Sequence, residues 1–219
     1  MTAIEIPAPK KRMKREDRER EIVRAAVAFF AEVGLDGDTR ELAKRLGVTQ
    51  SLIFRYFPNK AALIERVYQE VYVGRWNPYW ETIITDRNIS LNDRLLMLYK
   101  DYARVALTYD WVRIFMFSGL RGVDINTRYL NFLRNRVLAP IASELRAELG
   151  LPGFEEVPLQ EEEVELVWGI NARVFYLGQR QWIFDSPLVL DVDAIIEQAI
   201  TSFMYGAKEI VPKLILGKK

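Results

Sequence analysis

Hydrophobic residues recur at helical spacing along almost the whole chain, and no stretch shows the strict alternation typical of a β-strand. The first predicted helix carries an apolar stripe at positions i, i+4, i+7, i+8 and i+11, namely Ile22, Ala26, Phe29, Phe30 and Val33. Gly34 is expected to end this helix. Three shorter helices should follow, because Asp38, Thr49 and Asn59 are short polar residues that cap helix N-termini. Glu41, three residues after Asp38, completes a capping-box pattern.

A break is predicted at Gly74 and the segment Trp76-Asn77-Pro78, and we place a domain boundary near it. Further helices are expected after Ser90, after Asp110 and after Asp124, and the last of these should kink or restart at Pro140. Two long helices are predicted at roughly 159–184 and 192–211. The pattern predicts an all-α fold of about nine helices.

Residues 39–57 read TRELAKRLGVTQSLIFRYF and match a helix-turn-helix motif. Two helices that meet through a very short turn need a small residue where they approach, here Ala43. They also need a residue that tolerates positive φ in the turn, here Gly47. Inward positions of both helices are apolar: Leu42, Leu46, Val48, Ile53 and Tyr56. The alternative is an ordinary helical hairpin, which has no reason to satisfy all these positions.

The outward face of the second helix carries polar, aromatic and basic residues: Thr49, Gln50, Ser51, Phe54 and Arg55. In the major groove an amide can recognise adenine, a guanidinium can recognise guanine, and a hydroxyl can bind either base. Residues in the first turns of the two neighbouring helices are placed to bind phosphate: Thr39, Arg40 and Lys60. These residues form the candidate DNA-binding site.

The distribution of charge supports a contact with nucleic acid. The 219 residues have a formal net charge of +1, but residues 1–73 hold 14 Lys and Arg against 11 Asp and Glu. Much of this excess lies in a basic N-terminal arm, residues 1–15, which contains Lys10, Lys11, Arg12, Lys14 and Arg15. Such an arm can contact the minor groove or the phosphate backbone. The alternative is a solvated tail.

Composition argues against several other functions. The chain has no cysteine and no histidine, so disulfides, thiol nucleophiles, histidine bases and the commonest zinc ligands are excluded. The acidic cluster Glu161, Glu162, Glu163 and Glu165 is interpreted as a solvated helix N-terminus. The longest apolar run, 25–31, is far shorter than the roughly 20 residues of a membrane span, and the N-terminus lacks the order of a secretory signal. We therefore expect a cytoplasmic protein without a cofactor and without a membrane partner.

Residues 16–72 resemble the DNA-binding domain of the TetR family of bacterial transcriptional regulators. The segment GVTQSLIFRYFPNKAAL, residues 47–63, is similar to the family's recognition helix, aromatic pair, Pro-x-Lys and following helix. The resemblance implies a homodimer with an effector-binding C-terminal part, and it implies that Phe54, Tyr56 and Lys60 approach the DNA backbone. The family usually has tyrosine at position 54. Because Phe54 has no hydroxyl, we expect it to pack on a sugar or on a thymine methyl group.

The C-terminal part is rich in aromatic residues interrupted by polar ones. The candidate effector site consists of Tyr99, Tyr102, Phe115, Trp168, Asn171, Arg173 and Phe175. The alternatives are a packed core for the aromatic residues and an interhelical hydrogen bond for Asn171. Arg173 interrupts an otherwise apolar stripe, and its predicted partner is an acidic group, either on a ligand or across a dimer interface.

The last two helices are apolar over much of their circumference, which predicts a homodimer through a four-helix interface, with Gly178 and Ala199 allowing close approach. A two-fold dimer implies double-stranded DNA with an inverted-repeat operator. We predict a DNA-binding domain at 16–73 and an effector-binding and dimerisation domain at 74–219. The predicted function is a transcriptional regulator, a repressor released by a small, largely apolar effector. The alternatives are a helical protein-interaction scaffold and an all-α enzyme.

Overall fold

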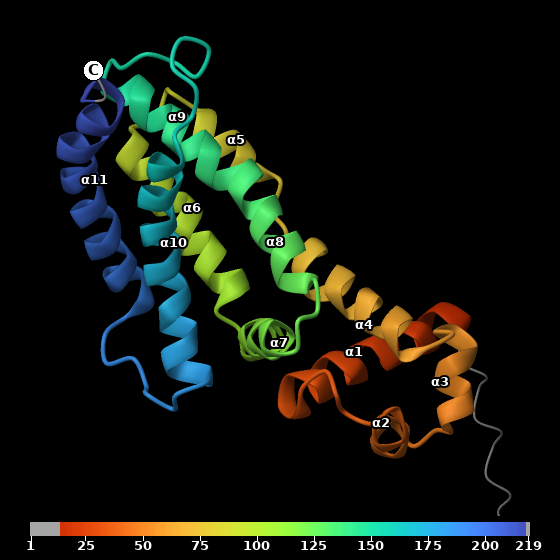
Figure 1. Cartoon of the computed structure of the whole chain (residues 1–219). Coiled ribbons are helices and arrows are strands. Elements are labelled where there is room, and N and C mark those ends of the chain that lie inside the picture. The colour runs from red at the N-terminus through yellow and green to blue at the C-terminus, as the bar shows by residue number, and fades with distance from the viewer. Residues whose placement is uncertain (1–13, 218–219) are drawn as a thin grey trace, which may run out of the picture.

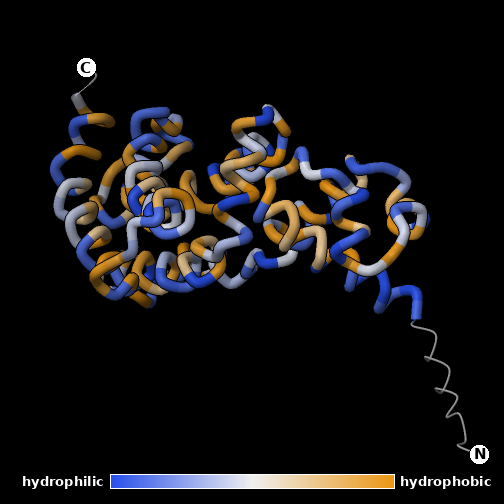
Figure 2. Tube along the Cα trace, turned by 90° about the horizontal axis from the view of Figure 1, so that it is seen from below, coloured by the Kyte–Doolittle hydropathy of each residue, from blue (hydrophilic) through white to orange (hydrophobic). Residues whose placement is uncertain are grey.

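The computed structural model describes residues 14–217, and within this range the chain forms α-helices, two short π-helices and no strand. The four helices of the N-terminal part are α1 (Arg15–Val33), α2 (Thr39–Leu46), α3 (Gln50–Tyr56) and α4 (Lys60–Tyr68). Figure 1 shows α2 and α3 at the end of the molecule opposite to α11. Hydrophobic and hydrophilic residues alternate along the helices (Figure 2), as expected for amphipathic helices around a core.

The expected helix ends of the N-terminal part are confirmed. Gly34 and Gly47 have φ angles of 86° and 68°, which glycine adopts without strain. The Asn59 side chain accepts a hydrogen bond from the Ala62 N–H at 2.8 Å. Asp38 also caps its helix, but the predicted capping box is not formed. The Glu41 carboxylate instead accepts hydrogen bonds from Arg45.

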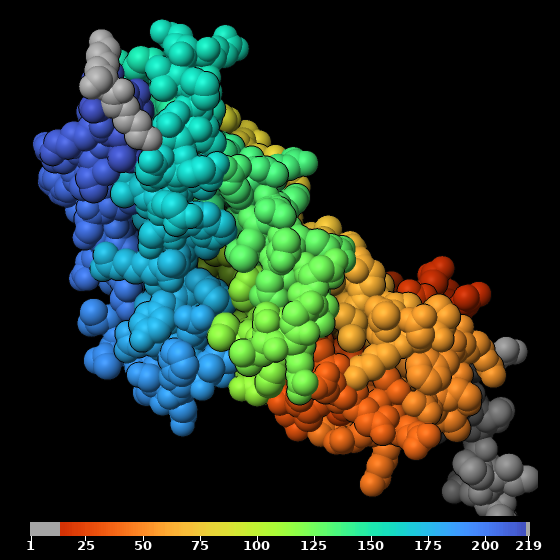
Figure 3. All heavy atoms as spheres, in the orientation of Figure 1, coloured from red at the N-terminus to blue at the C-terminus, as the bar shows by residue number. Residues whose placement is uncertain are grey.

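Helix α4 continues without interruption into the π-helix η1 (Gln69–Val73). This continuous helix carries the chain from the N-terminal part into the larger lobe, and the buried residues Val71 and Tyr72 lie at its far end. Figure 3 shows the atoms of α8 packed against those of α4. The two parts of the molecule are therefore in direct contact.

The larger lobe contains one helix that the sequence analysis did not predict, α5 (Tyr79–Thr85). It follows the break at Trp76-Asn77-Pro78 and buries Trp80, Ile83 and Ile84. Two turns are too short to establish a helical period in the sequence. The other helices of the lobe are α6 (Leu91–Ala106), α7 (Tyr109–Leu120), α8 (Ile125–Leu133), α9 (Ala139–Glu148), α10 (Glu161–Trp182) and α11 (Val192–Leu216).

The expected irregularity at Pro140 is present as the π-helix η2 (Arg134–Leu138), which joins α8 to α9 just before the proline. Proline lacks an N–H and clashes with the preceding turn, so a locally widened turn relieves both problems. Helix α11 extends beyond the predicted end at 211 and passes through Pro212. No helix in the described range is long and apolar enough to cross a bilayer.

Two expectations about packing are wrong. A Cβ atom on Gly178 would lie 2.7 Å from the side chain of Val112, so this glycine permits close approach of α10 to α7 within one chain. Ala199 is likewise buried within the chain. Glu163 is not solvated, because it is 2% exposed and forms an ion pair with Arg146 at 2.5 Å.

Candidate nucleic-acid interface

The helix-turn-helix is formed as the sequence predicts. Ile53 is fully buried and Ala43 is 3% exposed, and both face the core of the N-terminal part. Ser51 and Arg55 are exposed on the opposite side of α3. The Thr49 hydroxyl caps α3 by accepting a hydrogen bond from the Leu52 N–H at 3.3 Å. One face of α3 is therefore held by the core, and the other is exposed.

Two of the predicted DNA contacts lie differently from the expectation. Thr39 is only 5% exposed, and its hydroxyl accepts a hydrogen bond from the Gln50 amide at 2.7 Å. Gln50 is partly buried as a result. In this conformation the Thr39 side chain orients the amide of Gln50 instead of facing a phosphate. The amide of Gln50 keeps its second N–H and its oxygen for a base.

Four cations of helices α2, α3 and α4 make no ion pair within residues 14–217: Arg40, Lys44, Arg55 and Lys60. Most other cations of the N-terminal part are paired, since Arg18, Arg20, Arg45 and Arg66 each contact a nearby carboxylate. Unpaired cations gathered at one end of a molecule attract phosphate. Lys44 was not predicted, although its position one helical turn after Arg40 could have indicated it.

Phe54 and Tyr56 are both partly exposed, and the guanidinium of Arg15 lies 6.0 Å from the Tyr56 ring. The start of α1 is thus close to the end of α3. Of the predicted basic arm, only Lys14 and Arg15 belong to the described part of the chain. The other three basic residues of the arm lie outside it.

Three groups of contacts connect the DNA-binding part to the larger lobe. Arg113 on α7 donates hydrogen bonds to the backbone oxygens of Ala31 and Glu32 on α1, and also to that of Trp182 at the end of α10. Arg128 on α8 forms an ion pair with Glu65 on α4 at 2.7 Å. Arg121, just after α7, forms an ion pair with Asp36 in the loop after α1. These contacts set the orientation of α1 and α4 relative to the lobe.

An aromatic core lies directly behind this junction. We define it as Tyr72, Tyr102, Trp111, Phe115, Tyr129 and Phe175. Tyr72 comes from η1, and its hydroxyl donates to the backbone oxygen of Trp111 at 3.1 Å. The rings of Tyr72 and Trp111 meet edge to face with centroids 4.9 Å apart. The aromatic core thus joins the helix that begins at the DNA-binding site to the middle of the larger lobe.

The candidate effector residues separate into two groups. Tyr102, Phe115 and Phe175 belong to the aromatic core, and Tyr99 contacts Tyr102. Burial raises the pKa of Tyr102 to about 12 and that of Tyr129 well above its usual value. The buried hydroxyl of Tyr99 has no hydrogen-bond partner within the described residues, and neither has the buried side-chain oxygen of Asn171. The interhelical hydrogen bond considered for that oxygen is therefore not formed.

Trp168 is half-buried and packs against the hydrophobic core. Arg173 is exposed on α10, so the expectation that it lies on a buried stripe is wrong. On the same helix Leu166 is partly buried and Ile170 is buried, but position 173 faces solvent. The neighbouring helices cover only part of the circumference of α10. Arg173 is therefore not part of the aromatic core.

Comparison with known proteins gives the following matches. Residues 22–67 match the family model for bacterial regulatory proteins of the TetR family. The chain is 35% identical over 92 residues to the class A tetracycline repressor protein of transposon 1721 from Escherichia coli, covering 38% of this chain and 42% of the repressor. It is 32% identical over 104 residues to the Escherichia coli class D tetracycline repressor protein, covering 43% and 46% respectively. These matches span less than half the length of the curated relatives.

Among solved structures, a TetR-like transcriptional regulator from Rhodococcus sp. RHA1 aligns with a TM-score of 0.64. The alignment covers 95% of this chain and 100% of that chain at 14% sequence identity. The similarity therefore extends through the larger lobe at the level of the fold.

Proposed function

We propose that this chain is a transcriptional regulator of the TetR family that binds operator DNA as a homodimer and represses transcription, and the match of residues 22–67 to the family model supports this. The observation that carries the proposal is the exposed face of α3, surrounded by the four unpaired cations Arg40, Lys44, Arg55 and Lys60. A helix held on one side and open on the other can enter the major groove, while flanking cations bind phosphate.

Base recognition is assigned to Gln50, Ser51 and Arg55, and phosphate binding to Arg40, Lys44 and Lys60. Thr39 positions Gln50. The side chains of Thr49, Phe54 and Tyr56 complete the surface that faces the duplex. The basic N-terminal arm adds contacts that depend on charge and not on sequence.

Dimerisation is proposed through the faces of α10 and α11 that the subunit leaves exposed. On α10 these are Gly169, Ala172, Arg173 and Tyr176, and on α11 they are Thr201, Ser202 and Tyr205. The α10 residues recur at i, i+3, i+4 and i+7, and on α11 Tyr205 follows Thr201 and Ser202 by four and three residues, so each set lies on one helix face. The exposed position of Arg173 favours a role at this interface over contact with an effector. A two-fold dimer then requires an inverted-repeat operator.

Release by an effector is proposed to act through the continuous helix α4–η1. Lys60 lies at its first turn and Tyr72 lies near its other end, roughly 18 Å away along the helix axis. An apolar effector that enters the aromatic core must displace rings packed on Tyr72. Movement of Tyr72 shifts α4 and changes the separation of the two recognition helices. The effector weakens operator binding only if it binds the displaced arrangement more tightly.

The experiment is a fluorescence-anisotropy titration with DNA from the region flanking the gene, measured at several salt concentrations against a scrambled duplex. Gln50→Ala should reduce discrimination between operator and scrambled DNA by roughly 5- to 100-fold. Lys60→Ala should weaken binding to both duplexes similarly. It should also reduce the magnitude of the slope of log affinity against log salt concentration by about 1. Lys213→Gln, which removes an exposed cation of α11, is the control and should change neither. Equal affinity of the native protein for both duplexes would contradict the proposal.

A further inference from the structure

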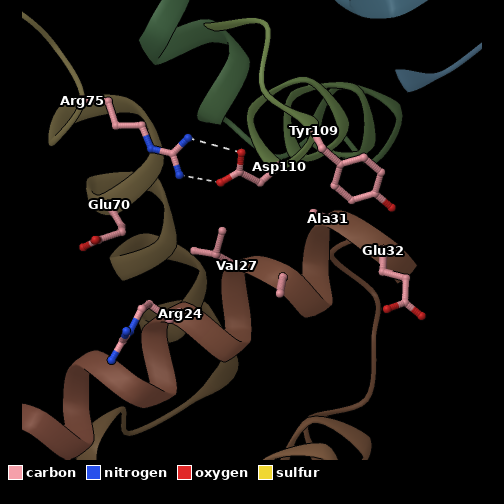
Figure 4. Close-up of a pocket in the computed structure, with 9 residues that line it drawn as sticks. Arg24, Val27, Ala31, Glu32, Glu70, Arg75, Tyr109 and Asp110 are labelled. Carbon is pink, nitrogen blue, oxygen red and sulfur yellow. Dashed lines mark hydrogen bonds and ion pairs between the residues drawn. The ribbon is translucent and has the colours of Figure 1, made fainter. Parts of the chain in front are cut away.

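A pocket of about 530 Å³ lies between the DNA-binding part and the larger lobe, apart from the aromatic core (Figure 4). One wall is α1, which contributes Val27, Ala28 and Ala31. The opposite wall consists of η1 and the segment after it, together with the start of α7. The volume lies within the range of small-molecule sites. None of the residues that line it belongs to the candidate DNA-binding site or to the aromatic core.

The α1 wall of the pocket is apolar along one helical stripe. This stripe consists of Val27, Ala28 and Ala31, which are spaced by one and three residues. The small side chains of the two alanines leave room for a ligand beside the helix. Ala28 is exposed, whereas Ala31 is completely buried. An apolar molecular body placed on this wall would remove exposed hydrocarbon from water.

The charged groups around the pocket leave one cation in excess. Asp110 is bound by Arg75 in the opposite wall, as the two dashed lines in Figure 4 show. Glu70 and Glu32 are likewise neutralised, because each forms an ion pair with an arginine outside the pocket. Arg24 and Glu32 line opposite ends of the pocket along α1. Arg24 is exposed and makes no ion pair within residues 14–217.

We propose that this pocket binds a small amphipathic organic anion, with its apolar body against Val27 and Ala28 and its acidic group paired with Arg24. Along α1, Arg24 and Ala31 are roughly 10 Å apart, which is the length of a two-ring molecule. The site goes beyond the proposed function, because it differs from the aromatic core in place and in ligand charge.

A ligand in this pocket contacts both parts of the molecule at once. The pocket exists because α1 lies beside η1 and α7 in the arrangement described here. A bound anion therefore stabilises this arrangement of α1 relative to any arrangement without the pocket. The anion strengthens operator binding if this arrangement binds operator DNA more tightly than the other, and weakens it if this arrangement binds operator DNA less tightly.

The test uses two fluorescent probes with the same ring framework. The first is 8-anilino-1-naphthalenesulfonate, which carries a negative charge, and the second is uncharged N-phenyl-1-naphthylamine. Each is titrated into the native full-length protein and into three variants without DNA. Arg24→Gln should lower the affinity for the anionic probe by roughly 3- to 10-fold and leave the affinity for the uncharged probe unchanged. Ala28→Phe, which occupies the apolar wall, should weaken both probes.

Lys213→Gln is the matched control for loss of one positive charge and should leave both affinities unchanged. Circular dichroism and the thermal midpoint establish that each variant is folded, because the probes also bind partly unfolded chains. The proposal is overturned if Arg24→Gln leaves the anionic probe unaffected, or if Lys213→Gln weakens it equally. Since no DNA is present, this result is independent of whether the operator-binding experiment succeeds.

Discussion

The guanidinium of Arg113 donates a hydrogen bond from Nε to the backbone oxygen of Ala31 across 2.6 Å. Ala31 lies in the last turn of α1, where backbone oxygens have no partner within the helix. The same guanidinium binds the backbone oxygen of Trp182, the last residue of α10, and lies over the rings of Tyr109 and Phe117. One side chain of α7 therefore holds the ends of two helices from different parts of the molecule.

Arg113→Gln should loosen both helix ends. A glutamine amide cannot reach three backbone oxygens, so the free energy of unfolding should fall by roughly 1–3 kcal/mol. Hydrogen exchange should become faster in peptides that cover the last turns of α1 and α10. Arg121→Gln is the control, because Arg121 bridges the same two parts through an exposed ion pair with Asp36 and should matter by less than about 1 kcal/mol. Equal effects of the two substitutions would contradict this role.

Thr39→Val should alter base selection without altering phosphate binding. The substitution keeps the shape of the side chain and removes the hydroxyl that holds the Gln50 amide. The protein should lose part of the roughly 1–3 kcal/mol by which a well-placed amide discriminates between the correct and the wrong base. Titration against operators substituted at single base pairs measures this loss. A changed salt slope with unchanged base preference would show that Thr39 binds phosphate directly.

Glu163→Ala should be among the most destabilising single substitutions in the larger lobe. It leaves Arg146, which is 1% exposed, without its carboxylate partner. Arg146 also donates to the backbone oxygens of Pro152 and Val157, so the 149–160 connection should loosen as well. The expected loss is about 3–5 kcal/mol in urea unfolding. Asp193→Ala, which removes partly exposed ion pairs with Arg104 and Lys100, should cost less than about 1 kcal/mol.

Stability should decrease in alkaline solution because of the buried tyrosines. Burial raises the pKa of Tyr102 to about 12, whereas an unfolded tyrosine ionises near its usual value of 10.0. The stabilisation is therefore complete below pH 10 and is lost as the pH rises toward 12, at about 1.4 kcal/mol per pH unit for this group. Urea unfolding from pH 9 to 12 should show a shallower decrease for Tyr102→Phe than for the native chain. Tyr79→Phe, at an exposed tyrosine, should behave like the native chain.

Features that depend on neighbouring residues could be predicted from the sequence. The helix-turn-helix is defined by Ala43, Gly47 and Ile53, whose roles follow from size, φ and the helical period, and the structure confirms each of them. The caps at Thr49 and Asn59 are equally local, because side chain and backbone partner are three residues apart. Helix α5 was missed because two turns carry too little periodicity.

The site was predictable only in outline. Periodicity identified the outward face of α3, but it contained no information on the hydrogen bond between Thr39 and Gln50, which are eleven positions apart in different helices. In the larger lobe, aromatic composition indicated the residues that form the aromatic core. It did not reveal that Tyr72 from the DNA-binding side completes that core.

The amino-acid sequence by itself determined the helical fold and the helix-turn-helix motif, because these follow from local spacing and local chemistry. Tertiary structure alone decided which polar groups are buried. Glu163 and Arg173 both lie on α10, yet one is buried beside Arg146 and the other is exposed. The period of a helix identifies its apolar face, whereas the burial of a charge depends on which distant segment packs there. The pocket beside Arg24 depends on the same kind of contact, since its walls are brought together only when α1 packs against α7.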